Sequence, residues 1–447
     1  MRRRNRWGLY GVGLVLVWLA LVLSEWLPRP TAAERDALTA LAVEPESLKG
    51  ERDGFAAIWL MGFDVPEDQL AQVLQADIAA YEKMLAQTGS VSEFQTSAQG
   101  KFATVAFPSG KDPALCELWK EDCLDRVRRA PEVARKRLAE FSTRLTRSRW
   151  LANYDHFHYA FTPRFESPIA SLGGLTNLQL TDAALQYVDG HIDQAFATLC
   201  SDTASWRRFR SRSDQLIHDM IGIAQISSAA ALYANMLAEQ PSDFSAPCPT
   251  VFAPLSDAEL DQCASLRFEF LSTRNSFEFL STRNSFEQGI SGIERLALAL
   301  ANKEHVIRTT AVAIGHYCQS NHRERIARRD PTRVQQAKVC GITAHVLDPA
   351  GCALAERSFT DYHDFFARAL DLDARLRLLG AALWMRKQPS SDPGSIFGQR
   401  PSELKSPHHQ FELIAPGKLL RMRNLDKGRG EYWQIPLLAA PADAAQP

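Results

Sequence analysis

The first 27 residues constrain this chain more than any other stretch. Four arginines among the first six residues precede a run of 18 uncharged residues, 7 to 24. As a helix this run would be roughly 27 Å long, close to the ~30 Å hydrocarbon thickness of a bilayer once it continues to Leu27. Arginines before an apolar span stay on the cytoplasmic side. The sequence therefore predicts a single membrane helix that contacts lipid from Trp7 to Leu27, with the rest of the chain across the membrane.

A cleaved signal peptide is the alternative reading of the same segment, because its basic start looks alike. The apolar run is longer than most signal-peptide cores, and the small residues at 31 to 33 follow two prolines, Pro28 and Pro30. These features favour an uncleaved anchor. Both readings export the body of the chain.

The cysteines fit an exported chain, because disulfides persist in oxidising compartments. Eight cysteines occur and no CxxC motif is present, which argues against thioredoxin-like chemistry. Two pairs close short loops, Cys116 with Cys123 and Cys340 with Cys352. Seven residues of continuous helix would separate the first pair by ~10.5 Å, so that bridge requires a helix that begins after Cys116. Buried free thiols are the alternative for each pair.

The body is predicted to be mainly α-helical. Apolar residues recur at spacings of three and four over 64–88, a second helical region at 113–150 should break at Pro131, and a capping box pairs Ser256 with Glu259. Further helices are expected over 178–240, 290–330 and 358–387. Short apolar segments around turns at 416–417 and 426–430 predict a small antiparallel β meander covered by a helix.

These elements define five units. We expect a cytoplasmic start and anchor at 1–28 and a linker at 29–53. A multi-helix body of hairpin or solenoid type follows at 54–388, then a loop with the meander at 389–437 and a disordered tail at 438–447.

One internal repeat interrupts the helical pattern. FEFLSTRNS occupies 268–276 and again 277–285. Nine residues advance a helix by 2.5 turns, so the second copy would point to the opposite side from the first. We expect a small duplication near a helix end or loop. If it forms one helix, that helix is apolar on two sides and lies between two layers or exposes a patch.

Charge and motifs exclude several functions. With 51 basic against 52 acidic residues, the chain lacks the net basic surface typical of nucleic-acid binding. No HExxH, GxSxG, GxGxxG or Walker A motif is present, so no cofactor is predicted. His316, Cys318 and His322 could be metal ligands, but a fourth ligand is missing and a disulfide is the preferred role of Cys318, so no metal is predicted.

Three histidines are the first suspects if the protein is an enzyme. His156 and His158 follow Asp155, and His363 lies between two aspartates, which are ingredients for acid-base catalysis. Sequence neighbours do not face one another on a helix or strand, so the pattern alone favours structural histidines. No catalytic residue is assigned unless these segments converge.

An arginine run is the candidate for an anionic partner. Arg207, Arg208 and Arg210 surround aromatic residues in WRRFR. Guanidinium groups bind phosphate and carboxylate in bidentate fashion, so an acidic protein patch, a headgroup or an anionic glycan would fit. The alternative is a solvated helix face paired with acids.

Several stretches carry a resemblance to a known group. The anchor, FAAIWLMGFD, CELWKEDCL, WRRFRSRSDQLIHDMI and DPGSIFGQRP occur in this order. In this the chain resembles a group of uncharacterised membrane-anchored proteins of Gram-negative bacteria. The resemblance implies a body in the periplasm and implies no activity.

Together these observations predict a single-pass inner-membrane protein whose periplasmic body binds or scaffolds an envelope protein, a peptide or a glycan. One alternative is an envelope hydrolase or transferase whose site assembles distant residues. Another is a periplasmic immunity or inhibitor protein.

Overall fold

The computed structural model describes twelve stretches of the chain: 30–42, 50–88, 90–108, 112–172, 174–282, 301–334, 340–357, 362–388, 392–414, 418–426, 428 and 430–437. The predicted membrane anchor at Trp7 to Leu27, the tail 438–447 and the turn 416–417 lie outside the described residues.

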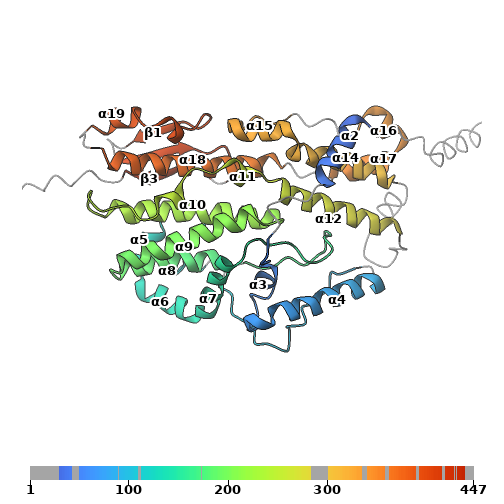
Figure 1. Ribbon diagram of the computed structural model, residues 1–447, viewed down its shortest axis with the longest axis horizontal. Coiled ribbons are helices and arrows are strands. Elements are labelled where there is room, and N and C mark those ends of the chain that lie inside the picture. Colours follow the sequence, from blue (N-terminus) through green and yellow to red (C-terminus); the bar gives the residue numbers. More distant parts are fainter. Residues whose placement is uncertain are drawn as a thin grey trace, which may run out of the picture.

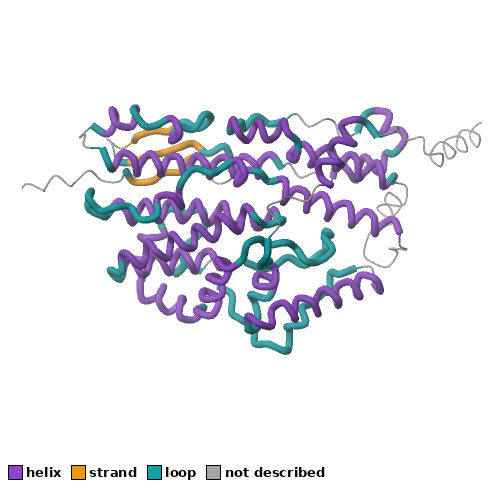
Figure 2. Tube along the Cα trace, viewed as in Figure 1, coloured by secondary structure: helices purple, strands orange, loops and turns teal. Residues whose placement is uncertain are grey.

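The described chain is mainly helical, which confirms the predicted class (Figures 1 and 2). The helices before residue 240 are α2 (Ala32–Ala42), α3 (Phe55–Trp59), η2 (Glu67–Gln69), α4 (Leu70–Thr88), α5 (Cys123–Arg129), α6 (Pro131–Glu140), α7 (Ser142–Trp150), η3 (Leu151–Asn153), α8 (Leu175–Val188), α9 (Ile192–Ser211) and α10 (Leu216–Ala238).

The later helices are η4 (Pro249–Phe252), α11 (Asp257–Leu260), α12 (Cys263–Thr282), α14 (Lys303–Gly315), η5 (His316–Cys318), α15 (Ser320–Arg328), α16 (Ile342–Leu347), α17 (Pro349–Arg357), α18 (His363–Arg386), α19 (Pro393–Gly398) and η6 (Ser402–Leu404). The strands are β1 (Phe411–Ile414), β2 (Leu419–Arg423) and β3 (Tyr432–Pro436).

Consecutive helices α8, α9 and α10 pack against one another, and α18 returns to pack on α10. Figure 1 shows α10 between α18 on one side and α9 on the other. Of the described helices, α10 alone is long and apolar enough to span a membrane, yet 83% of its apolar window is buried inside the protein. A helix that is apolar all round and buried is a core helix, so α10 forms the centre of the fold.

The C-terminal sheet is the predicted three-stranded antiparallel meander, in the order β1-β2-β3. Met422 of β2 pairs with Phe411 on one side and Trp433 on the other. Leu420, Met422, Trp433 and Ile435 alternate as buried residues. This apolar face packs on α10 and α18, the helical cover that a small sheet needs.

Two predicted boundaries differ from the structure. The expected linker 29–53 contains α2, whose Ala37 and Leu41 are buried against the core, and α2 packs on α14. Gly315 permits this approach, because a Cβ there would lie 2.8 Å from the Cβ of Ala37. The region predicted as helix from 113 begins only at Cys123, while the predicted break occurs, with α6 starting at Pro131.

The eight cysteines form four bonded pairs, and the described chain has no free cysteine: Cys116–Cys123, Cys200–Cys248, Cys263–Cys318 and Cys340–Cys352. Because α5 begins at Cys123, the helix does not separate Cys116 from it, and the two Cα atoms lie 4.9 Å apart.

The duplicated segment is helical as far as it is described. The first FEFLSTRNS copy and the start of the second lie in α12, and 283–285 lie outside the described residues. Phe268 packs against Tyr159 and Phe277 against Phe165, while α14 and α2 contact the same helix. The helix therefore lies between two layers, one of the two outcomes expected for a continuous duplication.

Candidate functional site

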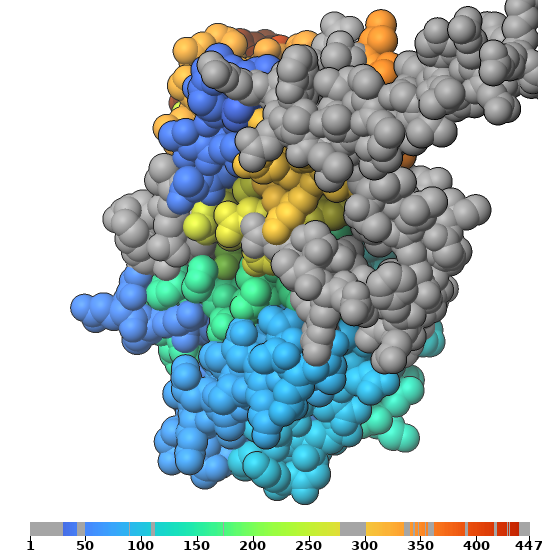
Figure 3. Space-filling model, turned by 90° about the vertical axis from the view of Figure 1, so that its right-hand side faces the viewer, coloured from blue at the N-terminus to red at the C-terminus, as the bar shows by residue number. Residues whose placement is uncertain are grey.

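A cleft of about 360 Å³ opens between α12, α4 and the segment 158–163, and we call it the α12 cleft. Figure 3 shows the face on which α2, α12 and α4 lie one above another, with the 158–165 segment between α12 and α4. Small-molecule sites commonly enclose about 300–1,000 Å³. Charged and apolar side chains line this cleft: Glu82, His158, Tyr159, Ala160, Phe161, Thr162, Pro163, Asp214, Ala264, Arg267, Phe268 and Leu271.

Backbone pairing fixes the wall of the cleft. Residue 156 forms a parallel bridge with Asp53, and Phe157 forms one with Ser213. The N–H of His158 donates to the Asp53 carboxylate at 3.1 Å, and Tyr81 donates its hydroxyl to the carbonyl of Thr162 at 2.8 Å. Three distant parts of the chain therefore hold the 158–162 segment in place.

Aromatic side chains form the floor of the cleft. Tyr159 and Phe161 are buried, and their ring centroids lie 5.6 Å apart. Phe268 meets the Tyr159 ring edge-on at 5.1 Å, and Phe55 meets it at 5.2 Å. Burial raises the pKa of the Tyr159 hydroxyl, which donates to the carbonyl of Pro168 and stays neutral. The floor therefore offers apolar area to a ligand.

His158 and Asp214 form the polar wall. His158 Nδ1 lies 3.0 Å from Asp214 Oδ2, and the two side chains are 43% and 6% exposed. The same oxygen accepts the backbone N–H of Tyr159 at 2.9 Å. Asp214 Oδ1 is buried and accepts no hydrogen bond from the described residues. The pair places an imidazole beside a carboxylate at the cleft, and Oδ1 can accept an N–H from a ligand or a water.

The structure does not bring the three suspected histidines into one pocket. His158 lines the α12 cleft, whereas His156 is 7% exposed and is not among the lining residues. His363 is the first residue of α18 and is also absent from the lining. The described lining includes no serine or cysteine, and its two hydroxyls are engaged: Thr162 donates to Glu82 at 2.7 Å and Tyr159 donates to the carbonyl of Pro168 at 2.8 Å. A reaction here would depend on water as the nucleophile.

The arginine run on α9 is engaged mainly inside the protein. Arg207 forms a bidentate pair with Glu259, and Arg210 pairs with the buried Asp219 at 2.7 Å. Arg208 is exposed and donates to the carbonyl of Ala152. An anionic partner at this run would therefore meet Arg208 first.

The residues weighed as metal ligands have other contacts. Cys318 is bonded to Cys263. The His322 ring is buried between Tyr317 and Phe366, with centroids 5.0 and 4.8 Å away, and burial lowers its pKa to about 3. Apart from these residues, His305 Nε2 lies 4.0 Å from the sulfur of Cys340. That sulfur is bonded to Cys352 in a disulfide.

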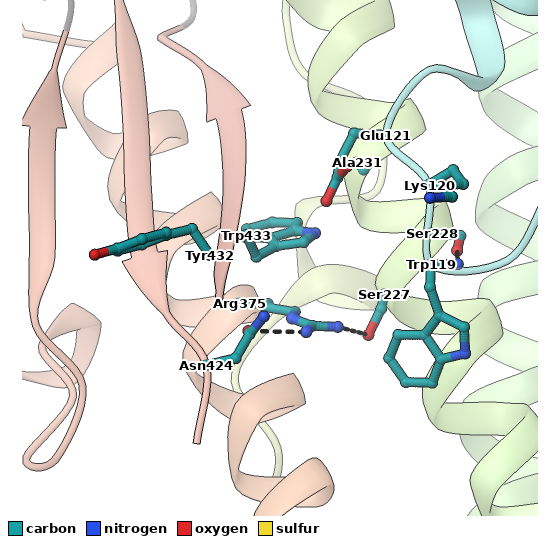
Figure 4. Close-up of a pocket in the computed structure, with 10 residues that line it drawn as sticks. All are labelled: Trp119, Lys120, Glu121, Ser227, Ser228, Ala231, Arg375, Asn424, Tyr432 and Trp433. Carbon is teal, nitrogen blue, oxygen red and sulfur yellow. Dashed lines mark hydrogen bonds between the residues drawn. The ribbon is translucent and has the colours of Figure 1, made fainter. Parts of the chain in front are cut away.

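A second, smaller pocket lies where the sheet meets α10 and the loop closed by Cys116 and Cys123, and we call it the Arg375 pocket (Figure 4). Its free volume is about 10 Å³, room for one water-sized group. The lining is Trp119, Lys120, Glu121, Ser227, Ser228, Ala231, Arg375, Asn424, Tyr432 and Trp433. In sequence these residues are dispersed: Trp119, Lys120 and Glu121 lie in the CELWKEDCL stretch, and the others come from α10, α18 and the sheet region.

The chain was compared with known proteins. No model of a protein family, no curated protein and no solved structure matches it.

Proposed function

We propose that the chain is a membrane-anchored periplasmic binding protein that holds a small amphipathic ligand, or the end of a peptide, in the α12 cleft. The observation that carries this proposal is the combination of an aromatic floor with a charged wall in a cleft of about 360 Å³. The helices α8 to α10 serve as the scaffold, because the backbone pairing of 156–158 with 53 and 213 attaches the cleft to them.

Two features support the location. The apolar run at 7–24 after an arginine cluster favours a single span with a cytoplasmic start. The four bonded cysteine pairs suit an oxidising compartment. Thiol alkylation of membranes without reductant should label none of the eight cysteines. Labelling of all eight would contradict the periplasmic placement.

The charges of the cleft suggest which ligand groups it prefers. Asp214 and Glu82 offer carboxylate oxygens, and Arg267 stands on the α12 side with its Nε donating to the carbonyl of Leu41 at 3.1 Å. A ligand with an N–H donor near Asp214 and an apolar body over Phe268 would satisfy both the bare oxygen and the floor.

Site-specific crosslinking tests the proposal in intact cells. A photoreactive residue replaces Ala264, which lines the cleft, and the matched control replaces Ala139, an exposed alanine of α6. The full-length protein should yield a crosslinked species from position 264 and none from 139. Equal or absent crosslinking at both positions would count against a ligand in this cleft.

The His158–Asp214 contact favours hydrolysis as the second candidate. His158→Gln keeps a side chain of similar size and removes the imidazole. If the protein is a hydrolase, this variant should bind its ligand without cleaving it. If it is a binding protein, the wild type and the variant should both release the ligand unchanged. A crosslinked species of protein size would instead favour the inhibitor alternative.

A further inference from the structure

Arg375 is a buried cation without a carboxylate partner. Its side chain is 3% exposed, and the guanidinium donates to Ser227 Oγ and to Asn424 Oδ1, both at 2.9 Å (Figure 4). No described carboxylate lies within 4.0 Å of it. Removing a charge from water without an opposite charge costs several kcal/mol, so a protein that keeps such a group needs a reason for it.

Other buried arginines of the described chain are satisfied in two ways: Arg144 donates to the carbonyls of Met61 and Ser171, whereas others pair with acids. Arg210, equally buried, is held by Asp219 at 2.7 Å. The acids nearest Arg375 along the fold have other partners: Asp371 binds His409 at 2.8 Å and Asp426 binds Arg368 at 2.6 Å. These carboxylates act on Arg375 only through space. Glu121, which lines the same pocket, also acts on Arg375 through space, so the guanidinium has three acids near it but no ion pair with a described carboxylate.

The guanidinium also has donors to spare. An arginine carries five N–H groups, and two of those of Arg375 are used by Ser227 and Asn424. Nε has no acceptor among the described residues. A single carboxylate oxygen accepts one or two N–H donors, so the remaining three suffice for it.

The loop beside Arg375 is held in a rare backbone conformation. Trp119 has φ of 65°, which bulky residues seldom adopt. The Cys116–Cys123 bond closes this loop, and the N–H of Trp119 donates to Ser228 Oγ at 3.0 Å. Strained residues cluster at ligand sites because the surrounding structure must hold them there. The strain here presents the indole to Arg375.

Two indoles flank the guanidinium. Its carbon lies 5.4 Å from the Trp119 ring centroid and 5.8 Å from that of Trp433. Figure 4 shows Arg375 extending between them from α18. Lys120 and Tyr432 are exposed at the rim. With room for about one water-sized group inside, one oxygen of a carboxylate can enter, and the rest of the ligand would lie over this rim.

We propose that the Arg375 pocket is a binding site for an organic carboxylate, which inserts one carboxylate oxygen against Arg375 while its body rests on Lys120 and Tyr432. This site is separate from the α12 cleft and does not depend on it. Acidic sugars and peptide C-termini share this chemistry.

Glu121 modulates the site. Its carboxyl lines the same pocket, and burial raises its pKa. A negative charge there repels an entering carboxylate. Glu121→Gln should therefore tighten carboxylate binding several-fold while leaving the binding of neutral analogues unchanged.

Tryptophan fluorescence of the full-length protein provides the assay, because Trp119 and Trp433 line the pocket. The probes are glucuronate and N-acetylalanine, with glucose and N-acetylalanine amide as their uncharged counterparts, and chloride as a simple anion. Saturable quenching by either carboxylate, and not by its neutral counterpart, is the expected result. The stronger carboxylate identifies the source as sugar or peptide. Equal responses to chloride or to the neutral compounds would overturn the proposal.

Two variants separate binding from a structural role. Asn424→Asp places an internal carboxylate beside Arg375, so it should raise the Tm and weaken carboxylate binding at least about tenfold. Arg375→Met should also abolish binding, without lowering the Tm, because it removes an unpaired buried charge. Arg386→Met, on the same helix but outside the pocket and bound only to backbone carbonyls among the described residues, should bind normally. Unchanged binding in Asn424→Asp, or a Tm that falls in both pocket variants, would show that Arg375 only supports the fold.

Discussion

Replacing Asp202 by asparagine should stabilise the protein, and the gain should grow as the pH rises. Asp202 lies on α9 and is 5% exposed. Its Oδ1 accepts a long hydrogen bond from Gln179 at 3.4 Å, and Oδ2 has no partner among the described residues. The nearest cation, Arg149, is paired with Asp182 at 2.7 Å. Burial therefore raises the pKa of Asp202 to about 7.

The direction and the size of this stabilisation follow from the protons that Asp202 binds in the folded and unfolded states. The folded state keeps the proton up to about pH 7, whereas the unfolded chain loses it near pH 3.8. Between these values the folded state binds more protons, so the free energy of unfolding falls as the pH rises. The difference of about three units between the folded and unfolded pKa values of Asp202 lowers the free energy of unfolding by about 4 kcal/mol at pH 8 and by about 2 kcal/mol at pH 5. An asparagine at 202 has no proton to lose and keeps both hydrogen-bonding functions.

Denaturant unfolding of the full-length protein at about pH 5 and pH 8 measures this difference. The free energy of unfolding of Asp202→Asn should exceed that of the wild type by about 4 kcal/mol at pH 8 and by about 2 kcal/mol at pH 5. The control, Asp193→Asn, changes an exposed carboxylate on the same helix and should show the same difference from wild type at both pH values. If Asp202→Asn differs from wild type equally at both pH values, the argument from burial is wrong.

Three further predictions concern stability. The double variant Cys263→Ser with Cys318→Ser removes a bridge across 55 residues and should lower the free energy of unfolding by about 4 kcal/mol, measured by urea titration. Asp77→Ala leaves buried donors without their acceptor, including the Trp59 indole, which donates to Asp77 at 2.7 Å. It should lower the free energy of unfolding by about 3 kcal/mol, and near-ultraviolet circular dichroism should report the changed surroundings of the indole. His322, whose pKa burial lowers to about 3, makes the fold less stable as the pH falls below about 6.5. His322→Phe should therefore gain about 2 kcal/mol over wild type at pH 5 and little at pH 8, and an equal gain at both would contradict this reasoning.

Local signals predicted the larger elements. The break at Pro131 follows from a ring that cannot continue a helix, and the meander follows from short apolar runs between turn residues. The helix 64–88 was placed correctly in its body but begins later, since Pro66 has an extended ψ of 145°. Its buried face includes Asp77, which periodicity of apolar residues could not reveal because that carboxylate is buried through bonds to Trp59 and Thr96.

Elements that depend on distant partners escaped prediction. α2 has 11 residues, and its only apolar side chains larger than alanine are two leucines; its place against α14 depends on the absence of a side chain at Gly315. His158 was a candidate from sequence, yet its partner Asp214 lies 56 positions away between two helices. No periodicity links two such residues, because the link is a pair of isolated backbone bridges rather than a helix face.

Charge density was a poor guide to the anionic site, and the reason is energetic. Exposed arginines pair with neighbouring acids at about 0–1 kcal/mol per pair, so they accumulate without a function, as the exposed pair of Arg328 and Glu324 on α15 illustrates. A single arginine inside an apolar helix is different, because its burial costs several kcal/mol. The sequence LDLDARLRLLGAAL of α18 does not reveal this, because Asp371, Asp373 and Arg377 surround Arg375 in the chain. Only the fold separates these four charges, since His409 binds Asp371 and Arg377 binds Asp373, whereas Arg375 forms no ion pair with a described acid.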